Sequence, residues 1–281
     1  MRRKFARKVK AKRVRRVKKG SRTNRLDSFY DKEHNQGMEQ MVNKTGYFHS
    51  KDAHLYYKRT GNPSGIPLIM LHGNRQSHRA YRKLVRYFSQ EYQIILLDSR
   101  GHGKSQFGKK QLSIELLAED TLGLVDELGF EQVILLGFSD GANVAITFAG
   151  SYPARVKAVI AVSPNIHLDG LKRGVVFLLR LNMAVFHLLE KLRLPVWKGK
   201  ELTLLMTGFK RPTEEVERIT APVLILTGKR DMIREEHAHL IADLIEKGQV
   251  EVLGNHDHFS MFRKSRLYAD VITQFLDKNH L

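Results

Sequence analysis

Residues 134–143 read ILLGFSDGAN, a short apolar run followed by a serine between two glycines and then by small residues. The apolar run predicts a buried strand that ends near Phe138, and the small residues after Ser139 predict a helix. A strand that turns directly into a helix needs a sharp corner, where side chains two positions away on either side would collide. Gly137 and Gly141 remove those collisions, so the sequence predicts that the corner lifts the Ser139 hydroxyl clear of the sheet.

A serine hydroxyl becomes a nucleophile when a base takes its proton, and the base needs an acid that orients it. Ligand sites in an open parallel sheet lie at the carboxyl ends of the strands. Asp231 follows a predicted strand at 222–228, and His256 and His258 follow the next one at 249–253. The order serine, acid, histidine is the one expected for this arrangement. The alternative is an ordinary Gly-rich turn with a helix-capping serine.

The tetrahedral oxyanion formed by attack on a carbonyl needs two backbone N–H donors. One is predicted to be Asp140, the residue after the nucleophile. The other is predicted to be Asn74, in a loop that follows a buried strand. His72, just before this loop, is interpreted as a turn residue that hydrogen-bonds to backbone, without a role in proton transfer.

Short apolar runs alternate with segments of helical periodicity through most of the chain. This alternation predicts an α/β fold, with a mostly parallel central sheet flanked by helices on both faces. Ser113 is expected to cap one helix, and Gly129 to end it. The predicted strands are 53–61, 67–73, 93–99, 132–138, 156–163, 222–228 and 249–253, and the predicted helices are 78–90, 113–129, 140–152, 235–248 and 266–278.

The alternation breaks between Pro164 and Thr213, where helical stretches follow one another without a strand, the main one over about 170–192. The chain therefore divides into three predicted parts. They are a basic, disordered extension (1–46), a core (47–163 and 214–281) and a short helical cap (164–213) inserted in the core.

The charge of the chain is concentrated at its start. The formal net charge is +19, and residues 1–26 contain 14 Lys or Arg and no acid. Such a tail would attract nucleic acid or an anionic membrane surface, the alternative being a solvated arm without a partner. Its apolar residues come singly or in pairs, so it lacks the apolar block of a signal peptide. The chain has no cysteine, which excludes disulfides and thiolate nucleophiles, and we expect a cytoplasmic protein.

Five segments together resemble the α/β-hydrolase superfamily, in particular its small esterase and lactonase-like members, over roughly residues 47–278. The resemblance implies that His258, which precedes the bulky Phe259, is the base, with His256 as the alternative. It also implies structural roles for Asp98, Arg100 and His102. The segments are LHGN (71–74), DSRGHGKS (98–105), GFSDG (137–141), LTGKRD (226–231) and NHDHFS (255–260).

The same resemblance narrows the chemistry. In this family the corner between strand and helix is called the elbow. Members that open epoxides or displace halide use a carboxylate at the elbow, where this chain has Ser139. Members that cleave N-terminal proline peptides typically hold the substrate amine with acidic cap residues, whereas the helix at 170–192 is mostly apolar and basic.

The insertion falls where this family places its cap, so it is expected to cover the mouth of the site. Most of its apolar side chains are expected to pack the cap on the body, and the rest to line an apolar substrate pocket. These side chains are Val175, Val176, Phe177, Leu178, Leu179, Leu181, Met183, Val185, Phe186, Leu188 and Leu189.

The sequence thus predicts a serine hydrolase that cleaves a carboxylic ester or lactone with a hydrophobic part, through an acyl-enzyme on Ser139. Nothing indicates a cofactor. One alternative is a non-catalytic or regulatory protein on the same scaffold, and another is a tail-anchored enzyme at an anionic membrane surface. A metal-dependent hydrolase with His256, Asp257 and His258 as ligands would leave the serine corner unexplained.

Overall fold

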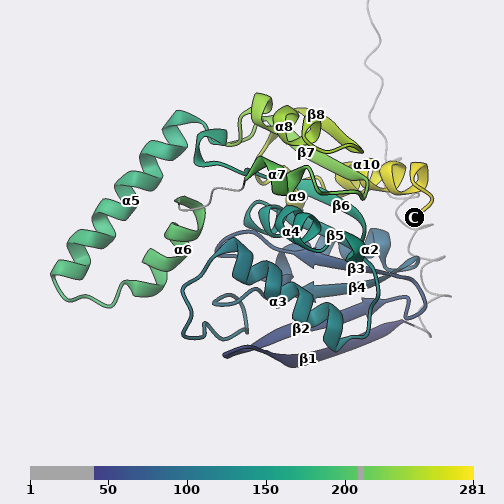
Figure 1. Cartoon of the computed structure of the whole chain (residues 1–281), viewed down its shortest axis with the longest axis horizontal. Helices are drawn as coiled ribbons and strands as arrows, with labels where there is room; N and C mark the ends of the chain where they lie inside the picture. Colours follow the sequence, from purple (N-terminus) through teal and green to yellow (C-terminus); the bar gives the residue numbers. More distant parts are fainter. Residues whose placement is uncertain (1–40, 208–211) are drawn as a thin grey trace, which may run out of the picture. The chain divides into compact units, whose positions relative to one another are not determined.

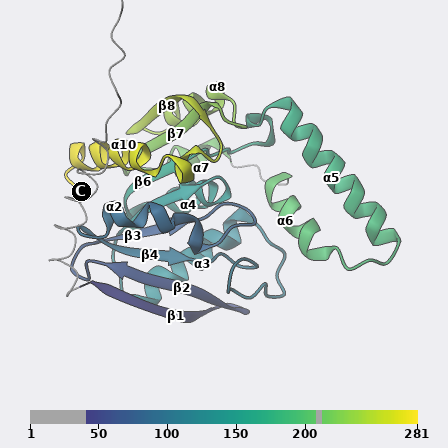
Figure 2. The same ribbon diagram turned by 180° about the vertical axis from the view of Figure 1, so that it is seen from behind.

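The computed structural model of the chain describes residues 41–207 and 212–281 (Figures 1 and 2). Eight strands form one sheet in the order β1-β2-β4-β3-β5-β6-β7-β8. β1 and β2 are antiparallel to each other and β2 is antiparallel to β4, whereas the remaining pairs are parallel. The strands are β1 (Val42–Ser50), β2 (Ala53–Gly61), β3 (Ile66–Leu71), β4 (Tyr92–Leu97), β5 (Val133–Phe138), β6 (Val156–Val162), β7 (Val223–Arg230) and β8 (Gly248–Asp257).

Helices cover both faces of the sheet, as predicted. One apolar core joins the sheet to α3, α4 and α8, and a second joins its other face to η2, α2 and α10. The Ser113 hydroxyl accepts from the N–H of Leu116 and caps α3, as predicted. These helices are η2 (His78–Lys83), α2 (Val85–Phe88), α3 (Ile114–Glu127), α4 (Asp140–Ser151), α8 (Glu235–Asp243) and α10 (Ser265–Lys278), with the short η3 (Pro153–Arg155), η4 (Leu168–Gly170), α7 (Thr213–Val216) and α9 (Ser260–Arg263) between elements.

Two predictions of local structure were wrong. The single helix predicted over 78–90 is a 3-10 helix, η2, followed by the short α2. At the start of this segment, Asp98 accepts from both the backbone N–H and the ring of His78. The predicted extension ends too late, since β1 begins at Val42 and pairs with β2 along its whole length. The disorder predicted for the tail, and its contacts with polyanions, concern residues outside the described ones.

The insertion after β6 contains two helices, α5 (Arg173–Lys191) and α6 (Trp197–Thr207), which form a hairpin (Figure 1). The prediction that most apolar side chains of α5 pack the cap on the body was wrong. Within the described part of the chain, no side chain of α5 is buried. Its contacts are made chiefly with α6, so the helix has a single packed side. No helix among the described residues is long and apolar enough to cross a membrane.

The loop after β4 is fixed by a buried charge cluster, in keeping with the structural roles predicted for Asp98, Arg100 and His102. The Arg100 side chain is fully buried and donates to Asp120 at 2.7 and 2.9 Å. It also donates to Asp52 at 2.6 Å, from the loop between β1 and β2. One guanidinium therefore ties the antiparallel end of the sheet to α3.

We expect Asp120→Ala to destabilise the protein by about 3–5 kcal/mol, because it leaves the buried Arg100 without its main partner. The double variant Arg100→Met/Asp120→Leu should recover much of that loss, since it removes both charges together. Asp126→Ala, which breaks an exposed pair with Arg155, should cost less than about 1 kcal/mol. Urea unfolding of the three variants measures these differences, and equal costs for the two single substitutions would contradict the prediction.

Candidate active site

The corner between β5 and α4 has the geometry that the sequence predicts. Ser139 has φ 53° and ψ −120°, a left-handed conformation that side chains rarely adopt. A Cβ on Gly141 would lie 2.0 Å from the carbonyl oxygen of Leu71, and one on Gly137 would lie 2.2 Å from the carbonyl oxygen of Gly141. Only glycine fits at these two positions, so the sequence GFSDG is required by the close approach of strand, helix and the neighbouring β3.

The structure brings Ser139, His258 and Asp231 into one hydrogen-bonded chain. The Nε2 atom of His258 lies 3.2 Å from the Ser139 hydroxyl, and its Nδ1 atom lies 2.7 Å from Oδ1 of Asp231. A carboxylate can only accept, so Nδ1 carries the proton and Nε2 is left as an acceptor for the hydroxyl. All three residues are buried.

Asp231 has two further donors. The Ser163 hydroxyl donates to Oδ2 at 2.5 Å, and the N–H of Ile233 donates to Oδ1 at 3.2 Å. Burial by itself raises the pKa of Asp231, but the hydrogen bond and positive charge of His258, together with these two donors, bring the pKa below its ordinary value. The carboxylate therefore stays ionised. Sequence reasoning missed Ser163, although its position at the end of β6, between the strands that carry Ser139 and Asp231, could have indicated it.

His256, the alternative candidate for the base, forms no hydrogen bond with Ser139 in the described part of the chain. It lies within β8, its ring packs against Tyr268 with 5.9 Å between centroids, and neither ring nitrogen has a hydrogen-bond partner among the described residues. The side chain of Asp257, between the two histidines, is half exposed and pairs with Arg263. Over residues 41–207 and 212–281, no group of three or more His, Asp or Glu side chains is arranged to hold a metal.

The loop after β3 places the predicted oxyanion donors next to the elbow. Gly73 to Gln76 form a turn, closed by a 3.2 Å bond from the N–H of Gln76 to the carbonyl of Gly73. Asn74 is the second residue of this turn, a position whose N–H is not used by the turn. Its side-chain amide donates at 2.8 Å to both Oδ2 of Asp140 and the carbonyl of Leu202 in α6. Asp140 is the first residue of α4, so its own N–H has no acceptor in the helix.

The carboxyl group of Asp140 is buried beside the nucleophile. Burial raises its pKa to about 6, against the opposing effects of the Asn74 hydrogen bond and the positive charge of His258. The sequence indicated only the backbone N–H of Asp140. Nothing in a residue type shows that its side chain will be turned inward.

Residues 66–198 match the sequence model of the family described as "alpha/beta hydrolase fold". The enol-lactonase from Burkholderia xenovorans LB400 aligns over 83% of this chain and 100% of its own, with a TM-score of 0.69 at 18% identity. The carboxylesterase CesB from Bacillus subtilis aligns over 90% and 97%, with a TM-score of 0.68 at 18% identity. The chain therefore has the α/β-hydrolase fold.

A curated relative matches a shorter part of the chain. "Epoxide hydrolase 4" from Mus musculus is 28% identical over 147 residues, which cover 50% of this chain and 41% of that protein. The matched part thus spans about two fifths of the relative's length.

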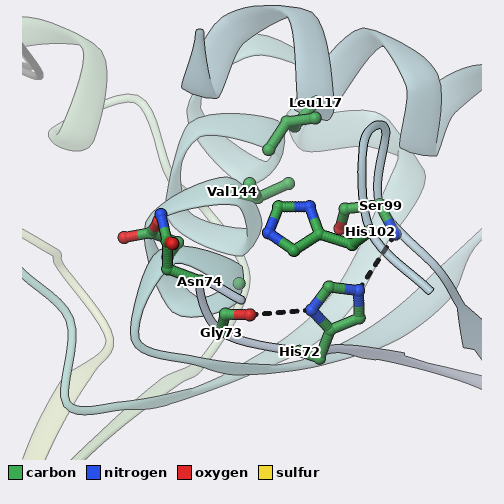
Figure 3. Close-up of a pocket in the computed structure, with 9 residues that line it drawn as sticks. His72, Gly73, Asn74, Ser99, His102, Leu117 and Val144 are labelled. Carbon is green, nitrogen blue, oxygen red and sulfur yellow. Dashed lines mark hydrogen bonds between the residues drawn. The ribbon is translucent and has the colours of Figure 1, made fainter. Parts of the chain in front are cut away.

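A small pocket lies beside the loop at residues 73–76, here called the oxyanion loop because it holds the predicted donor Asn74, and it is lined by polar and apolar side chains (Figure 3). His72 accepts from the N–H of Ser99 at 3.0 Å and bonds the carbonyl of Gly73 at 2.8 Å (Figure 3). Burial lowers the pKa of His72 to about 4, with a further lowering by the neighbouring His102. His72 is therefore neutral at pH 7, and both ring nitrogens are bonded to backbone, as predicted.

The raised pKa of Asp140 predicts a pH-dependent effect of Asp140→Asn on stability. A carboxyl that is harder to ionise in the folded state costs stability as pH rises through the interval from its ordinary pKa to about 6. We expect Asp140→Asn to remove that cost, so its effect should be more stabilising by about 2 kcal/mol at pH 7.5 than at pH 4.5. Urea unfolding of both proteins at the two pH values measures this. A difference that is constant with pH, or of opposite sign, would contradict the raised pKa.

Proposed function

We propose that the protein is a serine hydrolase that cleaves a carboxylic ester or lactone with an apolar part through an acyl-enzyme intermediate. The observation that carries this proposal is the hydrogen-bonded chain from Ser139 through His258 to Asp231, at a strained corner between strand and helix. A buried hydroxyl, imidazole and carboxylate in this order form the set of groups that activates a serine.

In the acylation step, the Ser139 oxygen attacks the substrate carbonyl while Nε2 of His258 takes the hydroxyl proton. The carbonyl π electrons move to oxygen, and the imidazolium is stabilised by the ionised Asp231, 2.7 Å from Nδ1. Collapse of the tetrahedral intermediate breaks the bond to the alcohol oxygen, which leaves with the proton from Nε2. In a lactone, that alcohol stays joined to the acyl group.

In the deacylation step, water replaces the alcohol. His258 takes a proton from the water molecule as the water oxygen attacks the acyl carbon. It returns that proton to the Ser139 oxygen as the acid is released. In both steps, the backbone N–H groups of Asn74 and Asp140 donate hydrogen bonds to the oxyanion. The side-chain amide of Asn74, bonded to Asp140 and Leu202, holds this loop against the elbow.

The elbow residue favours ester chemistry over epoxide opening, although a curated relative is named an epoxide hydrolase. Epoxide-opening members of the superfamily that the sequence resembles use a carboxylate at the elbow, where this chain has a hydroxyl. An enol-lactonase and a carboxylesterase are among the solved structures of the same fold. These names support, for this chain, substrates in which a carbonyl carbon is attacked.

Ser139→Ala should lower the rate of p-nitrophenyl ester hydrolysis by at least about 10⁴-fold, because the nucleophile is removed. His258→Gln should lower it to a similar extent. His256→Gln is the matched control, a histidine two residues away without a bond to the serine, and should retain the parental rate within about threefold. Steady-state kinetics of the three variants measure this, with circular dichroism as the check on folding.

A fluorophosphonate probe separates the proposal from a non-catalytic protein of the same fold. The probe should label Ser139 in the parent and in His256→Gln, and should not label Ser139→Ala. Failure to label the parent, or equal turnover by Ser139→Ala, would overturn the proposal.

A substrate with an apolar part, as proposed here, predicts a preference for esters with a hydrophobic acyl group. We expect kcat/KM for p-nitrophenyl esters to rise by at least about tenfold from acetate to a medium-chain ester, since burial of each added methylene contributes about 0.8 kcal/mol. Kinetics on esters from acetate to decanoate measure this. A flat series would exclude an apolar acyl pocket and leave the triad assignment intact.

A further inference from the structure

The outer side of α5 carries a row of large apolar side chains, which we call the cap stripe. The stripe consists of six residues. Because successive residues of a helix are turned by about 100°, the six side chains lie within one sector about 100° wide. A contiguous apolar surface of this kind, outside any packed core, marks an interaction site. Between 46% and 66% of each side chain is exposed; the six are Phe177, Leu178, Leu181, Val185, Leu188 and Leu192.

The opposite side of α5 is already occupied by α6. The Phe186 ring packs on Gly199, where an added Cβ would lie 2.7 Å from it, and Glu190 accepts from Lys200 at 2.7 Å. Asn182 lies 3.5 Å from the Thr203 hydroxyl. The helix therefore has two apolar sides, and packing within the described chain accounts for one of them.

Cations line one edge of the cap stripe. Arg173, Arg180 and Lys191 fall within about 20° of one another around the helix axis, directly beside the stripe. All three are exposed and form no ion pair with another described residue. Residues 172–200 contain seven Lys or Arg and a single acid, Glu190.

An apolar stripe with cations along its edge favours a lipid surface over a second copy of the chain as the partner. A second copy of the chain placed on the stripe would oppose two caps that each carry seven cations and one acid over residues 172–200, so the two copies would repel each other. An anionic bilayer instead accepts apolar side chains below its headgroups, while the long stems of Arg and Lys let their charges stay among the phosphates. We propose that the cap stripe docks on an anionic phospholipid surface, with Arg173, Arg180 and Lys191 at the headgroups.

Docking through the cap stripe would hold the proposed ester-cleaving site close to a lipid surface. This consequence rests on the proposed function, whereas the docking does not. The inactive Ser139→Ala variant should bind vesicles as the parent does. Loss of esterase activity and loss of docking are therefore separate outcomes.

A fluorescence experiment separates docking by the cap from attraction of the basic tail. The chain has a single tryptophan, so Trp197→Phe/Val185→Trp moves the only indole to the middle of the cap stripe. With vesicles of phosphatidylcholine and phosphatidylglycerol, its emission should shift to the blue and be quenched by brominated lipid. The matched reporter, Trp197→Phe/Leu267→Trp, places the indole at an exposed leucine of α10 and should show neither change.

Two sets of substitutions test the chemistry of the docking, with the Val185→Trp reporter as readout. Phe177→Ser/Leu181→Ser/Leu188→Ser should weaken partitioning at least tenfold, whereas Leu240→Ser/Leu267→Ser, at exposed leucines elsewhere, should leave it unchanged. Arg180→Gln and Lys191→Gln should each weaken binding to anionic vesicles about fivefold. Neither substitution should change binding to neutral vesicles.

Three results would overturn the proposal. One is sedimentation of the protein with vesicles while the introduced indole keeps its emission, which assigns binding to the tail. Another is a blue-shifted, concentration-dependent emission without lipid together with a dimer in analytical ultracentrifugation, which assigns the stripe to self-association. The third is the absence of any binding to anionic vesicles.

Discussion

The structure of the site depends on one strained backbone position, the left-handed conformation of Ser139. Such a conformation in a residue with a side chain costs about 1–3 kcal/mol and persists only where its surroundings determine it. Here the N–H of Ser139 is bonded to Val162 in the adjacent strand, and its carbonyl accepts the first bonds of α4. Gly137 and Gly141 permit the close approach that these bonds require. The same corner directs the hydroxyl at His258 and leaves the first N–H of α4 free for an anion.

Sheet order then explains why two buried carboxyls near the serine have opposite pKa shifts. Asp231 lies after β7, between Ser163 at the end of β6 and His258 after β8, and it receives donors from both sides. Those donors outweigh the effect of burial on its pKa. Asp140 receives one side-chain donor, from Asn74, so burial dominates and raises its pKa. The number of donors thus separates a carboxyl fitted to stabilise an imidazolium from one that resists ionisation.

The parts of the fold that could be predicted from the sequence are those set by local chemistry. Glycines around a serine require a corner, and apolar runs of strand length require burial, so the elbow and the parallel strands were predicted correctly. β1 was missed because it is an edge strand with many exposed polar residues and lacks an apolar run. The choice between His256 and His258 depends on where β8 ends, which is a property of pairing with β7. Ser163 and the side chain of Asp140 gain their roles only from neighbours that the topology supplies.

The cap shows a different limit of sequence reasoning. Apolar periodicity in α5 shows that the helix has apolar sides, but not which of them is covered, and α6 covers only one. The cap is also joined to the oxyanion loop, since the amide of Asn74 bonds at once to Leu202 in α6 and to Asp140 at the elbow. If α6 shifts, this amide must either follow it or lose one of its two hydrogen bonds, both of which are partly buried. A movement of α6 that the amide follows would displace the loop at residues 73–76, and Arg75 of the same loop also lies 3.5 Å from the Thr203 hydroxyl of α6. The position of the cap and that of the proposed oxyanion donor Asn74 are therefore coupled through this loop.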